Sequence, residues 1–183
     1  MKSRSRNQKA AGFSLVELTV AMFVLAVGVL GGMMMIILGM SRNNTNRVDT
    51  TATNIAQTVL EEISAAPPNV NKSLIITDCV QTDPATSTLQ INTAPGGATV
   101  LNGNIDFSAE SAATLQGNGY QMNYTVCGTN GVQTVYDVRW RVDLVGGANW
   151  SKLVTVSARQ PFIASQHGIS FLAPVTLRTI VGM

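Results

Sequence analysis

The chain has 183 residues, enough for one domain or for one domain with an appendage. Charged residues make up 12% of it, about half of the roughly 25% that is usual in soluble domains, and the mean hydropathy is +0.21. Residues 1–12 hold four of the 12 basic residues and no acidic one, which leaves 8 basic against 10 acidic residues in the remainder. The apolar composition argues against a wholly disordered chain and indicates a membrane segment. The charge distribution argues against a basic nucleic-acid-binding body.

The first element is an apolar run over residues 13–40, in which Glu17 is the one ionisable side chain. As a helix of 28 residues it would extend about 42 Å, more than the ~30 Å hydrocarbon core of a bilayer requires. The basic residues before it predict a cytoplasmic N-terminus and an exported remainder. A secretory signal peptide has an apolar stretch of only ~7–15 residues. We therefore expect a transmembrane segment over about residues 13–40.

Glu17 is unusual in such a segment, because a carboxylate inside hydrocarbon costs at least ~2.5–3.5 kcal/mol and requires a cationic partner. A cut between Gly12 and Phe13 would create an α-amino group four residues before Glu17, one helical turn away. That amine could lie in the same chain or in a neighbouring one. A single proteolytic event would thus supply the missing positive charge.

The sequence GFSLVEL at residues 12–18, behind a basic leader and ahead of a long apolar run, resembles the class III signal of type IV prepilins and type II secretion pseudopilins. The resemblance implies cleavage after Gly12 by an inner-membrane prepilin peptidase and N-methylation of Phe13 by the peptidase/methylase. It also implies an assembly ion pair between Glu17 and the Phe13 amine of an adjacent subunit. The resemblance implies three further partners. Other pilin subunits would be contacted through the N-terminal helix. The other two are the inner membrane and the pilus assembly platform.

Many major pilins have a proline in the apolar helix, whereas residues 13–66 contain none and are rich in glycine between Gly28 and Gly39. In this respect the segment is more similar to minor pilins or pseudopilins. The alternative outside the family is an ordinary single-span anchor that tolerates a glutamate near one membrane interface.

After the apolar run the pattern becomes amphipathic. Apolar residues recur at spacings of three and four, which predicts a helix with one buried stripe; they are Val48, Ala52, Ile55, Ala56, Val59, Leu60 and Ile63. We expect one long helix over residues 13–66 that is ended by Pro67 and Pro68, since proline disfavours helix at the preceding residue and has no amide donor.

Residues 67–183 are expected to form a globular head built mainly of strands. The clearest strand covers residues 132–145, where Tyr136, Val138 and Trp140 alternate with charged residues, and residues 146–149 predict a hairpin turn into 150–158. Other candidate strands are residues 73–78, 88–92, 121–127 and 153–158. Residues 93–119 are expected to be mostly loop. The predicted fold class is α+β and pilin-like: a long N-terminal helix packed on a mainly antiparallel sheet.

Cys79 and Cys127 both lie in the head, and an even pair in an exported domain predicts a disulfide bond. It would close a loop of 49 residues and stabilise the head by about 4 kcal/mol in the chain-entropy model. His167 is the only histidine and there is no CxxC motif, so we predict no metal and no cofactor. We find no nucleophile or phosphate-loop motif and therefore predict no catalytic residues and no enzyme activity.

Arg139 and Arg141, with Lys152 and Arg159 nearby, are candidates for a DNA-binding patch. Asp137 and Asp143 fall on the same face of the predicted strand, which nearly balances the charge. We therefore expect a solvated, self-paired strand face and no nucleic-acid partner.

The sequence thus predicts a structural subunit of a type IV pilus, most similar to a minor pilin. It would wait in the inner membrane with its N-terminus in the cytoplasm and its head in the periplasm, and then enter a filament at the cell surface. The first alternative is a pseudopilin of a type II secretion system, whose head often binds calcium; Asp78 and Asp83 are a sparse match to such a site. The second is a membrane-anchored periplasmic enzyme or binding module.

Overall fold

The computed structural model describes residues 14–67, 70–85, 87–129, 131–146, 151–161 and 173–182, and it gives the main chain but not the side chain of Asn44. The chain divides into two compact units, Met1–Asn44 and Thr45–Met183. Several sequence predictions lie outside the described residues: the leader 1–12 with Gly12, then Phe13, Pro68, residues 147–149 of the hairpin turn predicted at 146–149, and His167.

Helix α1 covers Leu15–Ala65, 51 residues, and contributes to both units. It stops where the sequence predicts, because the Ala66 amide already bonds to the Ile63 carbonyl at 3.3 Å and Pro67 has no amide to continue the ladder. In the second unit, α1 turns an apolar stripe inward, and its threonine hydroxyls donate to carbonyls one turn back, as from Thr50 to Asn46 at 2.8 Å. The second half of the helix is therefore amphipathic, as expected.

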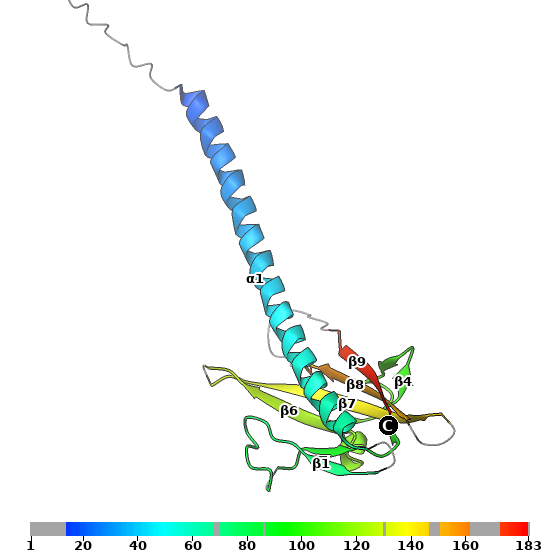
Figure 1. Ribbon diagram of the computed structural model, residues 1–183. Helices are drawn as coiled ribbons and strands as arrows, with labels where there is room; N and C mark the ends of the chain where they lie inside the picture. Colours follow the sequence, from blue (N-terminus) through cyan, green and yellow to red (C-terminus); the bar gives the residue numbers. More distant parts are fainter. Residues whose placement is uncertain are drawn as a thin grey trace, which may run out of the picture. The chain divides into compact units, whose positions relative to one another are not determined.

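The head contains a five-stranded antiparallel sheet with β7 (Gln133–Val145) at its centre (Figure 1). One edge of β7 pairs with β8 (Ser151–Arg159), which in turn pairs with β9 (Val175–Gly182). The other edge of β7 pairs with β6 (Gln121–Cys127) and with the short β3 (Gly96–Gly97). β6 and β9 are therefore the outermost long strands of this sheet.

The approach of β3 to β7 requires glycine. Gly97 has φ +114°, and a Cβ there would collide with the Trp140 carbonyl and the Tyr120 ring. The neighbouring Ala98 amide donates to that same carbonyl at 3.0 Å. The glycine pair thus allows a loop strand to join the sheet where a larger residue could not.

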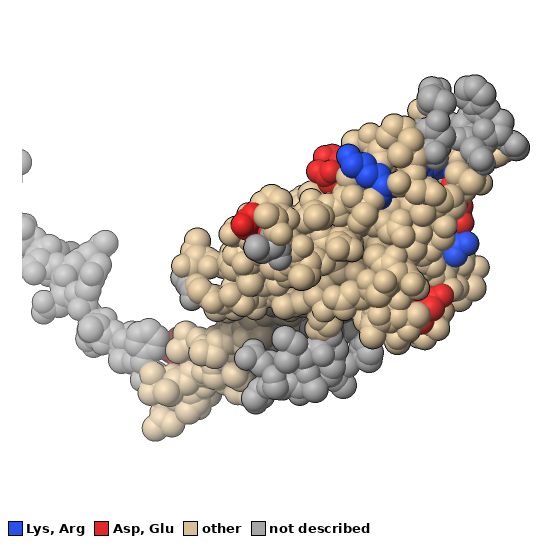
Figure 2. Space-filling view, turned by 90° about the horizontal axis from the view of Figure 1, so that it is seen from below, with Lys and Arg blue, Asp and Glu red and all other residues tan. Residues whose placement is uncertain are grey.

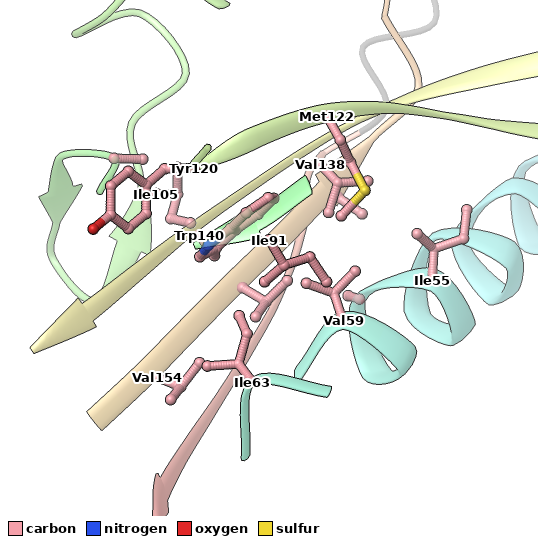
Figure 3. Close-up of a cluster of buried hydrophobic side chains, with 14 of the residues drawn as sticks. Ile55, Val59, Ile63, Ile91, Ile105, Tyr120, Met122, Val138, Trp140 and Val154 are labelled. Carbon is pink, nitrogen blue, oxygen red and sulfur yellow. The ribbon is translucent and has the colours of Figure 1, made fainter. Parts of the chain in front are cut away.

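One face of the sheet packs against the second half of α1. In Figure 3, Ile55, Val59 and Ile63 point from the helix toward the sheet. The buried sheet residues facing them alternate along each strand; they are Val138, Trp140, Val142, Val154, Val156 and Ala158. Each buried aliphatic side chain contributes about 1.5–3 kcal/mol relative to exposure, so this contact is the main stabilising core of the head.

The remaining elements surround the sheet. A separate antiparallel pair is formed by β1 (Ser73–Ile75) and β2 (Gln90–Asn92). The hairpin of β4 (Val100–Leu101) and β5 (Asn104–Ile105) turns through Asn102 and Gly103, both with positive φ, and helix α2 (Ala112–Gly117) follows, capped by the Ser111 hydroxyl.

Three predicted strands are confirmed closely: 121–127 is β6, 132–145 is β7 less its first residue, and 153–158 lies within β8. The strands predicted at 73–78 and 88–92 are shorter, because the chain folds into a turn around Asp78. The prediction of a loop over 93–119 missed β3, β4, β5 and α2. Strand β9 was also missed.

Lys152 is an exception within the core face. It lies opposite Leu144 and Val181 on the side of the sheet that carries Val154, is 1% exposed, and its Nζ has no hydrogen-bond partner among the described residues. Burial lowers the pKa of Lys152 below its ordinary value of about 10.5, because desolvation disfavours the ammonium form. An unpaired amine in this position destabilises the head whenever it is protonated.

We expect Lys152→Met to raise the free energy of unfolding of the full chain in detergent by on the order of 1–4 kcal/mol at pH 7. The stability of the unmodified head should rise with pH between the lowered folded-state pKa of Lys152 and the ordinary value near 10.5, because the cost of protonation disappears there. The variant should lose this rise. Urea unfolding followed by tryptophan fluorescence at several pH values measures both effects; an equal or lower stability of the variant would contradict the assignment.

Candidate functional site

The first turn of α1 carries the features that the sequence singled out. The Ser14 carbonyl accepts hydrogen bonds from the amides of Glu17, at 3.0 Å, and Leu18, at 3.1 Å, so the helix begins directly after Ser14. Glu17 lies in this first turn, where the positive end of the helix dipole stabilises a carboxylate. Its side chain is exposed and forms no salt bridge with any residue that the structure describes.

The apolar half of α1 presents its side chains outward on all sides. Every large apolar residue from Leu15 to Met40 is at least half exposed, from 51% for Val29 to 79% for Leu15. By length and composition, this helix could cross a membrane. A surface this apolar is not stable in water, so it must be covered by lipid or by other helices.

This half of the helix contains four glycines among its large apolar residues: Gly28, Gly31, Gly32 and Gly39. A Cβ at any of these positions would meet nothing within 4 Å in the single chain. Packing inside the subunit therefore does not explain them. Glycines in an apolar helix allow another helix to approach closely, which is consistent with helix-to-helix contact between subunits.

The structure joins Cys79 to Cys127, the disulfide that the sequence predicts, with the two Cα atoms 5.9 Å apart. The bond ties the segment after β1 to the end of β6. Asp78 strengthens the same junction: its Oδ2 accepts from the Thr125 amide at 2.8 Å, and its Oδ1 accepts from the amides of Val80 and Gln81 at 2.8 and 2.7 Å. This role of Asp78 was not predicted, although an aspartate next to a cysteine at a turn is a typical Asx-turn pattern.

These contacts explain the ionisation of Asp78. Burial by itself would raise its pKa, but hydrogen bonds from the backbone of Gln81, Thr125 and Val80 outweigh the desolvation, and the pKa is lowered below the ordinary 3.8. Both carboxylate oxygens are thus committed to main-chain amides. The described residues contain no group of three or more His, Cys, Asp or Glu side chains placed to hold a metal ion.

The sequence predicts that the strand face with Arg139 and Asp137 is solvated, and the structure shows that it is covered. Asp137 and Arg139 are self-paired as expected, with Nη2 to Oδ2 at 3.1 Å, but they are buried rather than solvated, at 6% and 3% exposure. Arg139 also donates to the carbonyls of Phe107 and Glu110 at 3.2 and 3.0 Å. The segment predicted to be loop covers this face, and Arg139 fastens it to the sheet.

The segment that contains Phe107 also contacts Arg159. The guanidinium carbon of Arg159 lies 4.0 Å from the Phe107 ring centroid, and its Nη2 lies 3.4 Å from Asp137 Oδ2. Arg141 is more exposed and pairs with Asp143 at 2.8 Å. On the face shown in Figure 2, charged side chains are few and stand among uncharged residues. These arginines therefore hold the head together and do not form a basic surface.

Comparison with known families gives a match at the N-terminus of the chain. Residues 7–33 match the model of the prokaryotic N-terminal methylation motif, which is the signature of type IV pilins and pseudopilins. The match includes Gly12, Phe13 and Glu17 and the first part of α1. The chain thus combines the N-terminal signature of pilin-like proteins with an α+β, pilin-like fold, and both features point to a structural role. Comparisons with curated proteins and with solved structures gave no match.

We expect Asp78→Asn to lower the free energy of unfolding by about 1–3 kcal/mol at pH 7, because an amide NH2 would then face a backbone amide donor. Since the folded-state pKa is lowered, the contribution of Asp78 is present above about pH 3.8 and is lost as the pH falls through that lower pKa. The variant should therefore show a weaker loss of stability in acid, measured by urea unfolding between pH 2 and pH 7, a range chosen to bracket the carboxyl titration.

Asp83→Asn is the matched control, because its Oδ1 accepts a hydrogen bond from the Ala85 amide that an asparagine oxygen can also accept. It should change the unfolding free energy by less than about 0.5 kcal/mol. Equal effects of the two substitutions would show that Asp78 has no special role in the disulfide junction.

Proposed function

We propose that this chain is a minor subunit of a type IV pilus. It is made as an inner-membrane prepilin with a cytoplasmic leader, cleaved after Gly12, methylated on the new Phe13 amine and assembled into a filament through α1. The observation that carries the proposal is the methylation motif at residues 7–33, continuous with a helix whose apolar half is exposed on all sides.

The physical argument links the two features. After cleavage, the Phe13 amine lies four residues before Glu17, so a charge pair can form within one chain or between neighbouring ones. N-methylation leaves the amine cationic. When apolar helices pack side by side, an unpaired Glu17 would be costly, whereas a Glu17 paired with a neighbour's amine is not. Correctly aligned neighbours are thereby favoured over misaligned ones.

A pseudopilin of a type II secretion system is the second candidate, since it shares the motif and the helix. Pseudopilin heads often hold calcium in an acidic loop, and Asp78 with Asp83 is the nearest match to such a loop in the sequence. The commitment of both Asp78 oxygens to backbone amides supports the pilus over this alternative. The proline-free, glycine-containing apolar helix supports a minor rather than a major subunit.

The first test is the mature N-terminus. We expect mass spectrometry of the chain from cells with prepilin peptidase to find a protein that begins at Phe13 and carries one methyl group on its amine. Cells without the peptidase should retain residues 1–12. An intact N-terminus in both strains, or a cut beyond Gly39, would contradict the proposal and favour an anchored or secreted domain.

The second test is Glu17→Ala. It should lower incorporation into filaments by about two to four orders of magnitude, because removing one partner of a buried ion pair costs ~3–5 kcal/mol. The variant should stay in the membrane with its Cys79–Cys127 disulfide formed. Thr19→Ala is the matched control within the same helix, since the Thr19 hydroxyl bonds only locally to the Val16 carbonyl, at 2.9 Å. Normal incorporation of the Glu17 variant in sheared filaments would overturn the assembly mechanism.

A further inference from the structure

The two outer strands of the main sheet are protected differently. At the β6 edge, the Thr125 amide donates to the Asp78 carboxylate and Cys127 is bound to Cys79, so the segment around Asp78 covers part of this edge. Such covering is a known way to keep a sheet edge from pairing with another chain. The C-terminal end of this edge is therefore blocked by a side-chain carboxylate and a disulfide.

The β9 edge has no comparable protection among the described residues. β9 pairs with β8 in unbroken register from Val175 opposite Ala158 to Gly182 opposite Ser151, without a bulge. No other described strand pairs with it, and Figure 1 shows it as the last strand beyond β8. In an antiparallel edge strand, alternate residues direct their amide and carbonyl groups away from the sheet. β9 contains no proline or lysine, and its one charged side chain, Arg178, is exposed and does not point inward.

Two exposed side chains lie along this edge, one apolar and one positively charged. Ile180 is 66% exposed and lies opposite Leu153, so these two side chains form an apolar contact surface beside the β9 edge. Arg178 is exposed and makes no salt bridge with any described residue; a Cβ on Gly103 would lie 2.9 Å from its Nη1, which places the guanidinium beside the β4–β5 turn. The edge thus offers main-chain hydrogen bonds, an apolar contact and one positive charge.

We propose that β9 is the docking edge for an extended strand of a different pilin-type subunit, with an acidic residue beside Arg178 and an apolar residue beside Ile180. The inference rests on the proposed function. Only an extended backbone can match a row of alternating amides and carbonyls. A second copy fits less well: its β9 contains no acidic residue and would bring a second Arg178 to the contact, while its β6 edge is already covered.

The test compares hydrogen exchange of the full chain in sheared filaments with that of the full chain in detergent. We expect alternate amides of Val175–Gly182 to exchange at least tenfold more slowly in filaments, while the exposed amides near Val132 do not change. A chain that is absent from filaments refutes the proposed function. A chain that is present but has equally fast β9 amides refutes the docking edge alone, so the two failures are distinguishable.

Substitutions then test the chemistry of the edge. Ile180→Lys adds an edge-blocking charge beside Arg178 and should reduce incorporation about tenfold, and Arg178→Glu should reduce it similarly. Val132→Lys is the matched control, because Val132 is 64% exposed in the turn between β6 and β7. Normal incorporation of Ile180→Lys, or equal loss in the control, would overturn the proposal.

The identity of the partner is tested with a photo-reactive phenylalanine at position 180 in cells that assemble filaments. We expect a cross-link to an extended segment of another prepilin-type subunit, mapped by mass spectrometry and lost when Arg178 is changed to Glu. A cross-link to β9 of a second copy would overturn the assignment of a different subunit as the partner.

Discussion

The structure depends on one constraint: a single helix must suit two different surroundings. In the second half of α1, an apolar stripe that includes Ile55, Val59 and Ile63 packs on the sheet, and polar side chains face water. In the first half no face is polar, and every large apolar side chain from Leu15 to Met40 is at least half exposed. The head can therefore be complete as a folded unit while the subunit as a whole is not, because the first half requires lipid or other helices.

The sheet of the head has two faces, and α1 covers only one of them. The opposite face carries Asp137 and Arg139, which would be an ordinary solvated pair if the face were open. Instead the Phe107–Glu110 region covers it, and Arg139 bonds to two of its carbonyls. A buried ion pair is a weak source of stability, but leaving it half-satisfied would be costly. The network therefore fixes where the covering segment lies more than it stabilises the head.

Much of this architecture follows from local patterns in the sequence. The α1 stripe and the alternation in β7 have clear periods, and Pro67 marks the helix end without reference to the rest of the fold. β9 escaped prediction because Thr179 faces the core and Ile180 faces outward, which reverses the expected alternation. The burial of Arg139 could not be predicted either, since it depends on a segment 29 and 32 residues earlier in the chain. Gly12, Phe13 and Glu17 could be singled out from the sequence because they lie in a local motif, residues 7–33, and the roles proposed for them do not depend on the fold of the head.

The apolar helix and the open β9 edge have different capacities for discrimination. Side-by-side packing of apolar helices is tolerant of sequence, and the proposed Glu17-to-amine pair would fix alignment but would be available to any subunit processed in the same way. Hydrogen-bonded strand addition with a charge beside Arg178 is selective, because a mismatched partner leaves polar groups unpaired in the contact. A subunit built in this way would gain most of its affinity for a filament from α1, while the head would determine which neighbour it accepts. The covered β6 edge makes this selection directional, since only one side of the sheet can add a strand without displacing the Asp78 segment.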